Sequence, residues 1–145
     1  MEVKIKKLRD GARVPERGTG DAAGADLYAC LDAAVTVDAH KTVMIPTGIA
    51  AELPPYYAGL VFARSGLASK RDLAPANKVG LIDPDYRGEI MVALHNHGEA
   101  PQTIEPGERV AQLVLVPYVA PDFTEADELS ETDRGAGGFG STGTK

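Results

Sequence analysis

Residues 80–89, Gly-Leu-Ile-Asp-Pro-Asp-Tyr-Arg-Gly-Glu, gather two aspartates, a tyrosine and an arginine into one short segment. Apolar, strand-like runs flank the segment, so it is expected to form a hairpin region. A carboxylate held there could take a proton from water, as general base catalysis requires. The same residues could also make an ordinary polar turn, in which Asp83 or Asp85 caps a backbone N–H group.

A second segment, Arg64-Ser65-Gly66-Leu67-Ala68, carries groups suited to an anion. At a strand-to-helix junction, the Arg64 guanidinium, the Ser65 hydroxyl and free backbone N–H groups would point to one place, which suits phosphate. A plain N-cap serine beside a surface arginine is the alternative.

A third segment, Arg109-Val110-Ala111-Gln112-Leu113, begins a strongly apolar strand. The period of two in a regular strand places Arg109 and Ala111 on the face opposite Gln112. Because Gln112 stands among apolar neighbours, its amide needs a partner, and either a ligand or a neighbouring backbone group would serve.

The C-terminal residues 134–143 place five glycines, an arginine, a phenylalanine and a Ser-Thr pair in ten positions. Such a segment lets backbone N–H groups crowd around an anion, while its hydroxyls and guanidinium add directional donors. Its aromatic ring offers a face on which a base could stack. Composition alone favours a disordered tail.

Three other positions could carry chemistry. Asp26, at the start of a strand, is either a turn residue or an acid that orients metal-bound water. His95 and His97 would share a face of one strand, but no further Cys or His cluster completes a metal site with them. Cys30 is the single cysteine, which excludes an intrachain disulfide, and it is expected to be a buried apolar residue.

The elements that must position these groups are strands. Turn signals separate many short apolar or β-branched runs, and helical periodicity is nearly absent, which predicts an all-β, jelly-roll-like barrel or sandwich. One short helix is expected near residues 66–71. The expected strands lie around residues 3–5, 27–29, 35–37, 42–45, 59–63, 90–94, 102–104 and 110–119.

The chain divides into two parts by pattern. We expect a β-barrel core over residues 1–119 and a flexible arm over residues 120–145, because the strand pattern stops near Ala120 and an acidic stretch leads into the glycine-rich end. The 145 residues suit a single domain.

Charge and composition exclude some functions. A net charge of −6 argues against a broad basic surface for nucleic acid, although a few arginines could still converge on one phosphate ligand. No signal pattern and no apolar run of membrane-spanning length is present, so a cytoplasmic location without a membrane partner is expected.

Taken together and in order, five segments resemble the motifs of the trimeric deoxyuridine triphosphatase (dUTPase) family. They cover nearly the whole chain, and five motifs in register are far more specific than any one of them. The five segments are Ala23–Ala29, Arg64–Ala68, Gly80–Glu89, Arg109–Leu113 and Arg134–Gly143.

The resemblance implies a dUTP diphosphatase that releases dUMP and pyrophosphate, limiting uracil in DNA and supplying dUMP for thymidylate synthesis. Asp83 would hold and deprotonate the water that attacks the α-phosphorus. A magnesium ion (Mg²⁺) would bind the triphosphate, and Asp26 would act on it indirectly, through water. The phosphates would be cradled by Arg64, Ser65, Gly66 and Gln112.

For the nucleoside, the resemblance implies that residues 77–86 form a hairpin that reads uracil largely through backbone groups. Tyr86 would pack on the deoxyribose and exclude a 2′-hydroxyl. The expected base-side contacts are Asn77, Gly80 and Ile82. In the C-terminal arm, Phe139 would stack on uracil. The arm residues expected near the terminal phosphate are Arg134, Gly140, Ser141 and Thr142.

The family assembles as a homotrimer whose active sites draw on all three chains, so the same is expected here. The chain departs from the family pattern at Lys78 and Val79, which replace a small residue and a proline, and at Ala63, which replaces a proline. We expect altered rigidity from these changes. A dCTP deaminase-like enzyme and a non-catalytic nucleotide-sensing regulator on the same fold are the alternatives.

Overall fold

The computed structural model describes residues 1–138 and has antiparallel strands throughout, with one short helix. The largest sheet holds five strands in the order β2 (Glu16–Arg17), β3 (Ala25–Tyr28), β12 (Arg109–Pro117), β7 (Tyr57–Phe62) and β9 (Gly80–Ile82). A three-stranded sheet has the order β5 (Thr42–Pro46), β10 (Met91–Asn96) and β8 (Leu73–Pro75). Two strand pairs complete the body: β1 (Lys4–Lys7) with β6 (Ile49–Glu52), and β11 (Gln102–Ile104) with β4 (Val35–Val37).

The core lies between these sheets and is built from alternating positions of the strands. Strand β10 illustrates the period of two, since its second, fourth and sixth residues are buried while the first is exposed. Several large side chains are entirely inaccessible to solvent: Leu27, Val37, Ile45, Leu73, Leu94 and Ile104.

The short helix α1 (Ser65–Arg71) connects β7 to β8 and buries Leu67. It ends at Asp72, which adopts a left-handed conformation with φ of 54°. From its last turn, the Arg71 guanidinium donates to the Gln102 side chain at 3.1 Å, to the Thr103 carbonyl and to the Glu108 carboxylate. These bonds fasten α1 to β11 and to the turn before β12.

Strand β7 is paired on both sides, and its register sets where the two pockets of the chain lie. On one side Phe62 pairs with Gln112 and Tyr57 with Pro117, while on the other Gly59 pairs with Ile82. Because the pairings are antiparallel, the start of β12 and the end of β9 lie at opposite ends of β7.

The predicted all-β organisation and the helix near residues 66–71 are confirmed. Pattern analysis missed β2, β6, β8 and β9, because strands of two to four residues have too few alternating positions to form a recognisable pattern. The last predicted strand is also shorter than expected and ends at Pro117 rather than near residue 119.

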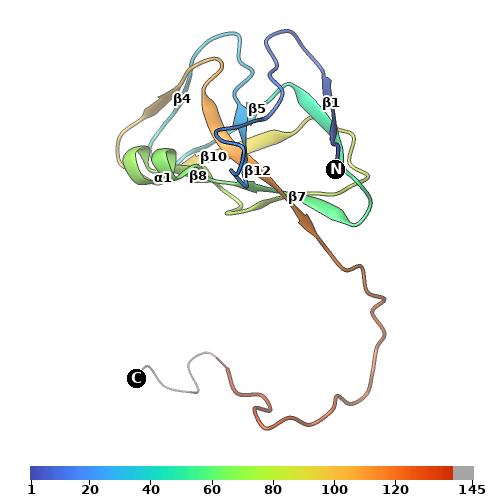
Figure 1. Cartoon of the computed structure of the whole chain (residues 1–145). Coiled ribbons are helices and arrows are strands. Elements are labelled where there is room, and N and C mark those ends of the chain that lie inside the picture. The colour runs from blue at the N-terminus through green and yellow to red at the C-terminus, as the bar shows by residue number, and fades with distance from the viewer. Residues whose placement is uncertain (139–145) are drawn as a thin grey trace.

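After β12 the chain runs clear of the sheets (Figure 1). Residues 118–138 contain neither helix nor strand. Large apolar side chains there are almost fully exposed: Val119 (87%), Phe123 (92%) and Leu129 (87%). Within residues 1–138, no helix has the length and apolar character needed to span a bilayer.

Gly48, in the turn between β5 and β6, is required by both conformation and space. Its φ is +70°, and an added Cβ would lie 2.7 Å from Cys30 Sγ and 2.8 Å from Ala12 Cβ. We expect Gly48→Ala to lower the free energy of unfolding by about 2–4 kcal/mol, from left-handed strain plus overpacking. Urea denaturation of the wild type and the variant measures this loss.

Gly107→Ala is the matched control, since Gly107 has φ of +77° and open space around its Cβ position. It should cost only the conformational term, about 1–2 kcal/mol. Equal losses in the two variants would contradict the packing role of Gly48.

Candidate functional site

One polar hollow, here called the arginine pocket, lies where β3 and the start of β12 meet the beginning of α1. It brings together segments that are distant in the sequence. It is lined by Gly18, Ala22, Gly24, Asp26, Arg64, Ser65, Gly66, Arg109 and Gln112. All five residues of the core expected from sequence to act on or near phosphate are among them.

Asp26 organises the charges of the arginine pocket. Its Oδ1 accepts from Arg64 Nε at 2.8 Å, and its Oδ2 accepts from an Arg109 guanidinium nitrogen at 3.2 Å. The Asp26 side chain is only 14% exposed. Two guanidinium groups share one carboxylate, so the cluster carries a net positive charge that suits an anion.

Arg109 was predicted to lie on the face opposite Gln112, and this prediction was wrong. The pairing of β12 with β3 is regular at Gln112 and Asp26 but shifts between Arg109 and Ala111. A β-bulge inserts one extra residue into a strand and reverses the alternation beyond it. Arg109 and Gln112 therefore line the same pocket, and the sequence analysis missed Arg109 as a site residue.

The partner of the Gln112 side chain is a backbone group. Its amide nitrogen donates to the Ala63 carbonyl at 2.9 Å. Gly24 allows this side chain to pass, since a Cβ at position 24 would lie 2.5 Å from Gln112 Oε1. The amide is thus oriented before any ligand arrives.

Ser65 and Gly66 enter the pocket as the first residues of α1. Both are exposed. Arg64 occupies the N-cap position in an extended conformation, with no side-chain hydrogen bond capping the helix. The expected serine cap is therefore absent, and the Ser65 hydroxyl is not used as a cap.

Tyr28 lies beside this cluster, opposite Arg109 in the sheet. Burial raises the pKa of Tyr28, and the nearby Glu16 carboxylate raises it further. The phenol therefore stays neutral at physiological pH and adds no charge to the arginine pocket.

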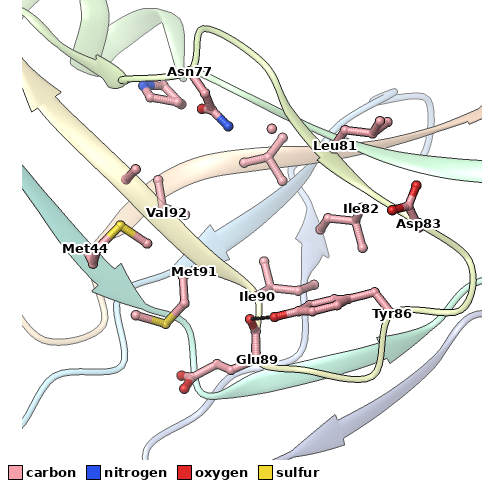
Figure 2. A pocket seen from close by; sticks show the side chains of 14 residues that line it. Met44, Asn77, Leu81, Ile82, Asp83, Tyr86, Glu89, Ile90, Met91 and Val92 are labelled. Atoms are coloured by element: carbon pink, nitrogen blue, oxygen red, sulfur yellow. Dashed lines mark hydrogen bonds between the residues drawn. The ribbon is translucent and has the colours of Figure 1, made fainter.

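A second hollow lies between the β8–β9 connection, β9 and β10 (Figure 2), and is here called the hairpin pocket after the hairpin expected over residues 77–86. That hairpin is not formed, because β9 pairs with β7 and β8 pairs with β10. The volume of the pocket is about 370 Å³, within the range of small-molecule sites. Apolar side chains of β5, β9 and β10 contribute to its wall, including Met44, Ile82 and Val92. The five residues expected from sequence to contact the nucleoside or its attacking water all line it: Asn77, Gly80, Ile82, Asp83 and Tyr86.

The loop after β9 carries Asp83 and closes on itself. The Tyr86 amide donates to the Asp83 carbonyl at 3.2 Å, and the Arg87 guanidinium donates to the Pro84 and Tyr86 carbonyls. The Asp83 residue is exposed. Its loop is thus ordered by its own hydrogen bonds while the acid remains open to water.

The connection between β8 and β9 turns through Lys78 in a strained conformation. Lys78 has φ of 66°, and the Val79 amide donates to the Asn77 carbonyl at 2.7 Å, a tight three-residue turn. A left-handed residue of this kind favours glycine. The departure from the family pattern noted at Lys78 therefore falls on a position where the backbone is under strain.

The two pockets share no lining residue. Asp83 follows Ile82, which pairs with Gly59, whereas Arg64 lies just beyond the other end of β7. The intervening stretch of about six residues corresponds to roughly 20 Å of extended chain. Within one chain, the two pockets are therefore separated by about the length of β7.

The arm residues contribute to neither pocket within the described part of this chain. Arg134 is exposed, and its Nε donates to the Gly137 carbonyl at 2.8 Å in a local turn. The predicted contacts at Phe139, Gly140, Ser141 and Thr142 lie outside the described residues.

His95 and His97 lie close together, and their ring centroids are 4.5 Å apart. Over residues 1–138, however, no three or more His, Cys, Asp or Glu side chains are grouped to hold a metal ion.

The model of the dUTPase family matches residues 10–143 of this chain. The chain belongs to the dUTPase family. A deoxyuridine 5′-triphosphate nucleotidohydrolase of Desulfitobacterium hafniense (strain DSM 10664 / DCB-2) is 51% identical over 146 residues, covering 99% of this chain and 97% of the relative. The corresponding protein of Acinetobacter baylyi is 47% identical over 148 residues, covering 100% and 99%.

Solved dUTPase structures share the fold. The dUTPase of Staphylococcus bacteriophage 80alpha with dUPNHPP has a TM-score of 0.90 at 30% identity and covers 99% of each chain. A mutant dUTPase of phage phi11 of S. aureus, described with a structural Mg(II) ion, has a TM-score of 0.79 at 26% identity and covers 88% of this chain and 98% of its own. The predicted jelly-roll-like fold and family membership are confirmed.

The close approach of Gly24 to Gln112 yields a prediction about the arginine pocket. Gly24→Ala should displace the Gln112 amide and weaken binding of inorganic tripolyphosphate about tenfold, which calorimetric titration measures. Gly20→Ala in the same segment is the control, because nothing lies within 4 Å of its Cβ position. Unchanged affinity in Gly24→Ala would mean that Gln112 takes no part in anion binding.

Proposed function

We propose that this chain hydrolyses dUTP to dUMP and pyrophosphate by attack of water on the α-phosphorus. One observation carries the proposal. The chain is a member of the dUTPase family, and it has both a nucleoside-sized pocket with an exposed carboxylate, Asp83, and a separate arginine pocket. A relative 51% identical over almost the full chain is named for this activity, and the phage 80alpha enzyme is described with dUPNHPP.

In this proposal the hairpin pocket takes the nucleoside. Backbone groups of the Asn77–Ile82 segment pair with uracil, and their donor pattern rejects cytosine because mismatched polar groups would stay buried and unpaired. Gly80 supports this close approach, since a Cβ there would lie 3.1 Å from Val61 Cβ. Tyr86 packs against the deoxyribose, and Asp83 deprotonates the attacking water.

The arginine pocket takes the phosphates. Arg64, the Ser65 hydroxyl, Gly66 and Gln112 bind their oxygens, and Arg109 joins this set because the bulge brings it there. Phosphoryl transfer with an in-line leaving group depends on positioning and charge neutralisation, which these donors supply. Pyrophosphate leaves with the charge that the guanidinium groups stabilise.

We further propose a homotrimer with shared active sites. The separation of about 20 Å between Asp83 and Arg64 along β7 supports it, because a hairpin pocket of one subunit would then face an arginine pocket of another. A core of residues 1–119 and an arm of residues 120–145 belong to the same proposal. The exposed Phe123 and Leu129 of the arm are suited to packing on a neighbouring subunit.

The glycine-rich end of the arm would complete the site. Arg134, Ser141 and Thr142, with the backbone of Gly140, would bind the terminal phosphate, and Phe139 would stack on uracil. The exposed guanidinium of Arg134 supports this role, because its only hydrogen bond among the described residues is to a carbonyl in its own turn.

Magnesium would enter as the partner of the triphosphate. Asp26 already gives one carboxylate oxygen to Arg64 and the other to Arg109, so it fits a contact through water better than direct ligation. When bound, Mg²⁺ would neutralise charge on the triphosphate oxygens. A cytoplasmic location stays a prediction, supported by the buried, unpaired Cys30.

Product analysis tests the activity. Purified protein incubated with dUTP, dCTP or UTP and magnesium should release pyrophosphate from dUTP, with dCTP and UTP left largely unchanged. Release of ammonia from dCTP would contradict the proposal and identify the chain as a deaminase. Binding of dUTP without any product would indicate a nucleotide-sensing regulator.

Asp83→Asn should lower kcat by about 10²–10⁴-fold and keep dUTP binding, because the amide preserves shape and removes the base. Single-turnover kinetics and calorimetry measure the two effects separately. Asp85→Asn, two residues along the same loop, is the control and should stay near wild type. A near-normal rate in Asp83→Asn would refute the role of Asp83.

Mixed subunits test the shared site. Asp83→Asn and Arg64→Ala chains, each inactive alone, should recover about one quarter of the wild-type activity after co-refolding at equal amounts, since random pairing joins intact halves at that frequency. Sites contained within single chains would recover nothing.

A further inference from the structure

Glu89 lines the hairpin pocket, yet the proposed reaction gives it no task. Its side chain is only 19% exposed, and both carboxylate oxygens are engaged. Oε2 accepts from an Arg9 guanidinium nitrogen at 2.7 Å, and Oε1 accepts from the Gly48 amide at 2.7 Å. In Figure 2 this carboxylate points away from Asp83 and Tyr86. The Glu89 carboxylate is therefore occupied by other parts of the same chain, and it anchors its loop to them.

The anchor point is rigid. The Leu8 amide donates to the Gly48 carbonyl at 2.7 Å, and Gly48 itself packs on Cys30 and Ala12 with no space for a side chain. The neighbouring residue Ile90 is also tied down, since its carbonyl accepts from the buried Thr47 hydroxyl at 2.6 Å and its amide donates to the Ile49 carbonyl at 2.8 Å. The backbone around Glu89 is thus held to the β5–β6 turn.

Tyr86 takes its orientation from the same place. Its hydroxyl donates to the Glu89 carbonyl at 3.0 Å, the bond drawn in Figure 2. The ring lies against Gly88, where an added Cβ would be 2.3 Å from the Tyr86 hydroxyl oxygen. With 46% of its surface exposed, Tyr86 is not held in place by burial. A shift of the Glu89 backbone would therefore rotate the ring.

We propose that Glu89, held by Arg9 and Gly48, is a positioning residue that orients Tyr86 and thereby sets the discrimination between deoxyribose and ribose triphosphates. The discrimination rests on the proposed function, whereas the orientation of Tyr86 stands on the geometry alone. The Arg9–Glu89 pair joins positions 80 residues apart, so the N-terminal segment becomes part of the sugar-selecting machinery.

Two variants weaken the anchor from either end. Glu89→Gln keeps the side-chain volume and an acceptor for the Gly48 amide but loses the charge that holds Arg9. Arg9→Gln removes the other partner, and because Arg9 is 48% exposed this variant should fold normally. Lys4→Gln is the matched control, since it breaks another ion pair of the N-terminal segment, Lys4–Glu52, and the Lys4 ammonium bonds to neither Glu89 nor Tyr86.

The first readout is the ratio of kcat/KM for dUTP to that for UTP. It should fall about tenfold in Glu89→Gln and in Arg9→Gln, mainly through a higher KM for dUTP, and stay unchanged in Lys4→Gln. A lower thermal stability with an unchanged ratio would reduce Glu89 to a purely structural residue and overturn the proposal.

The second readout needs no activity. In protein labelled with fluorotyrosine, the ¹⁹F resonance of Tyr86, assigned by its loss in Tyr86→Phe, should shift or broaden in both anchor variants and not in Lys4→Gln. An unmoved resonance overturns the positioning role. If the wild type fails to hydrolyse dUTP, the proposed function and the sugar discrimination both fall, and this resonance still decides whether Glu89 orients Tyr86.

Discussion

The antiparallel pairing of β7 with β12 on one side and β9 on the other is the constraint on which the rest of the structure depends. It fixes the start of β12 and the end of β9 at opposite ends of a six-residue strand. The arginine pocket and the hairpin pocket are therefore separated by backbone geometry, and side-chain rearrangement cannot close a gap of roughly 20 Å. We propose that assembly of several chains, rather than a conformational change within one chain, joins them.

The arginine pocket solves an electrostatic problem. A chain with net charge −6 that binds a triphosphate must concentrate positive charge locally. The bulge in β12 does this by turning Arg109 to the side of Arg64, and Asp26 holds both guanidinium groups in place through one carboxylate. The pocket is thus arranged before a ligand binds, which lowers the cost of ordering these long side chains on binding.

The hairpin pocket is arranged by other means. Its loop satisfies its own backbone groups, and its two ends are attached to different parts of the body, the strained turn at Lys78 to β8 and the Glu89 carboxylate to the β5–β6 turn. Exposed loop residues can do precise chemistry only when a rigid scaffold holds them. Here Gly48 supplies that rigidity, because a side chain at this position would meet both backbone strain and steric overlap.

The sequence by itself determined the all-β class, the single short helix and the family, since turn residues, strand alternation and the five motifs are all local patterns. It also identified Asp83, Asn77 and Tyr86 as one group and Asp26, Arg64 and Gln112 as residues of another, although it did not place the two groups apart. Only the tertiary structure decided that Arg109 joins the second group, that Glu89 is tied to Arg9, and that β2, β6, β8 and β9 are strands. Each of these depends on a contact between distant residues, in a bulge, an ion pair or a short edge pairing, and such contacts leave no periodic trace in the chain.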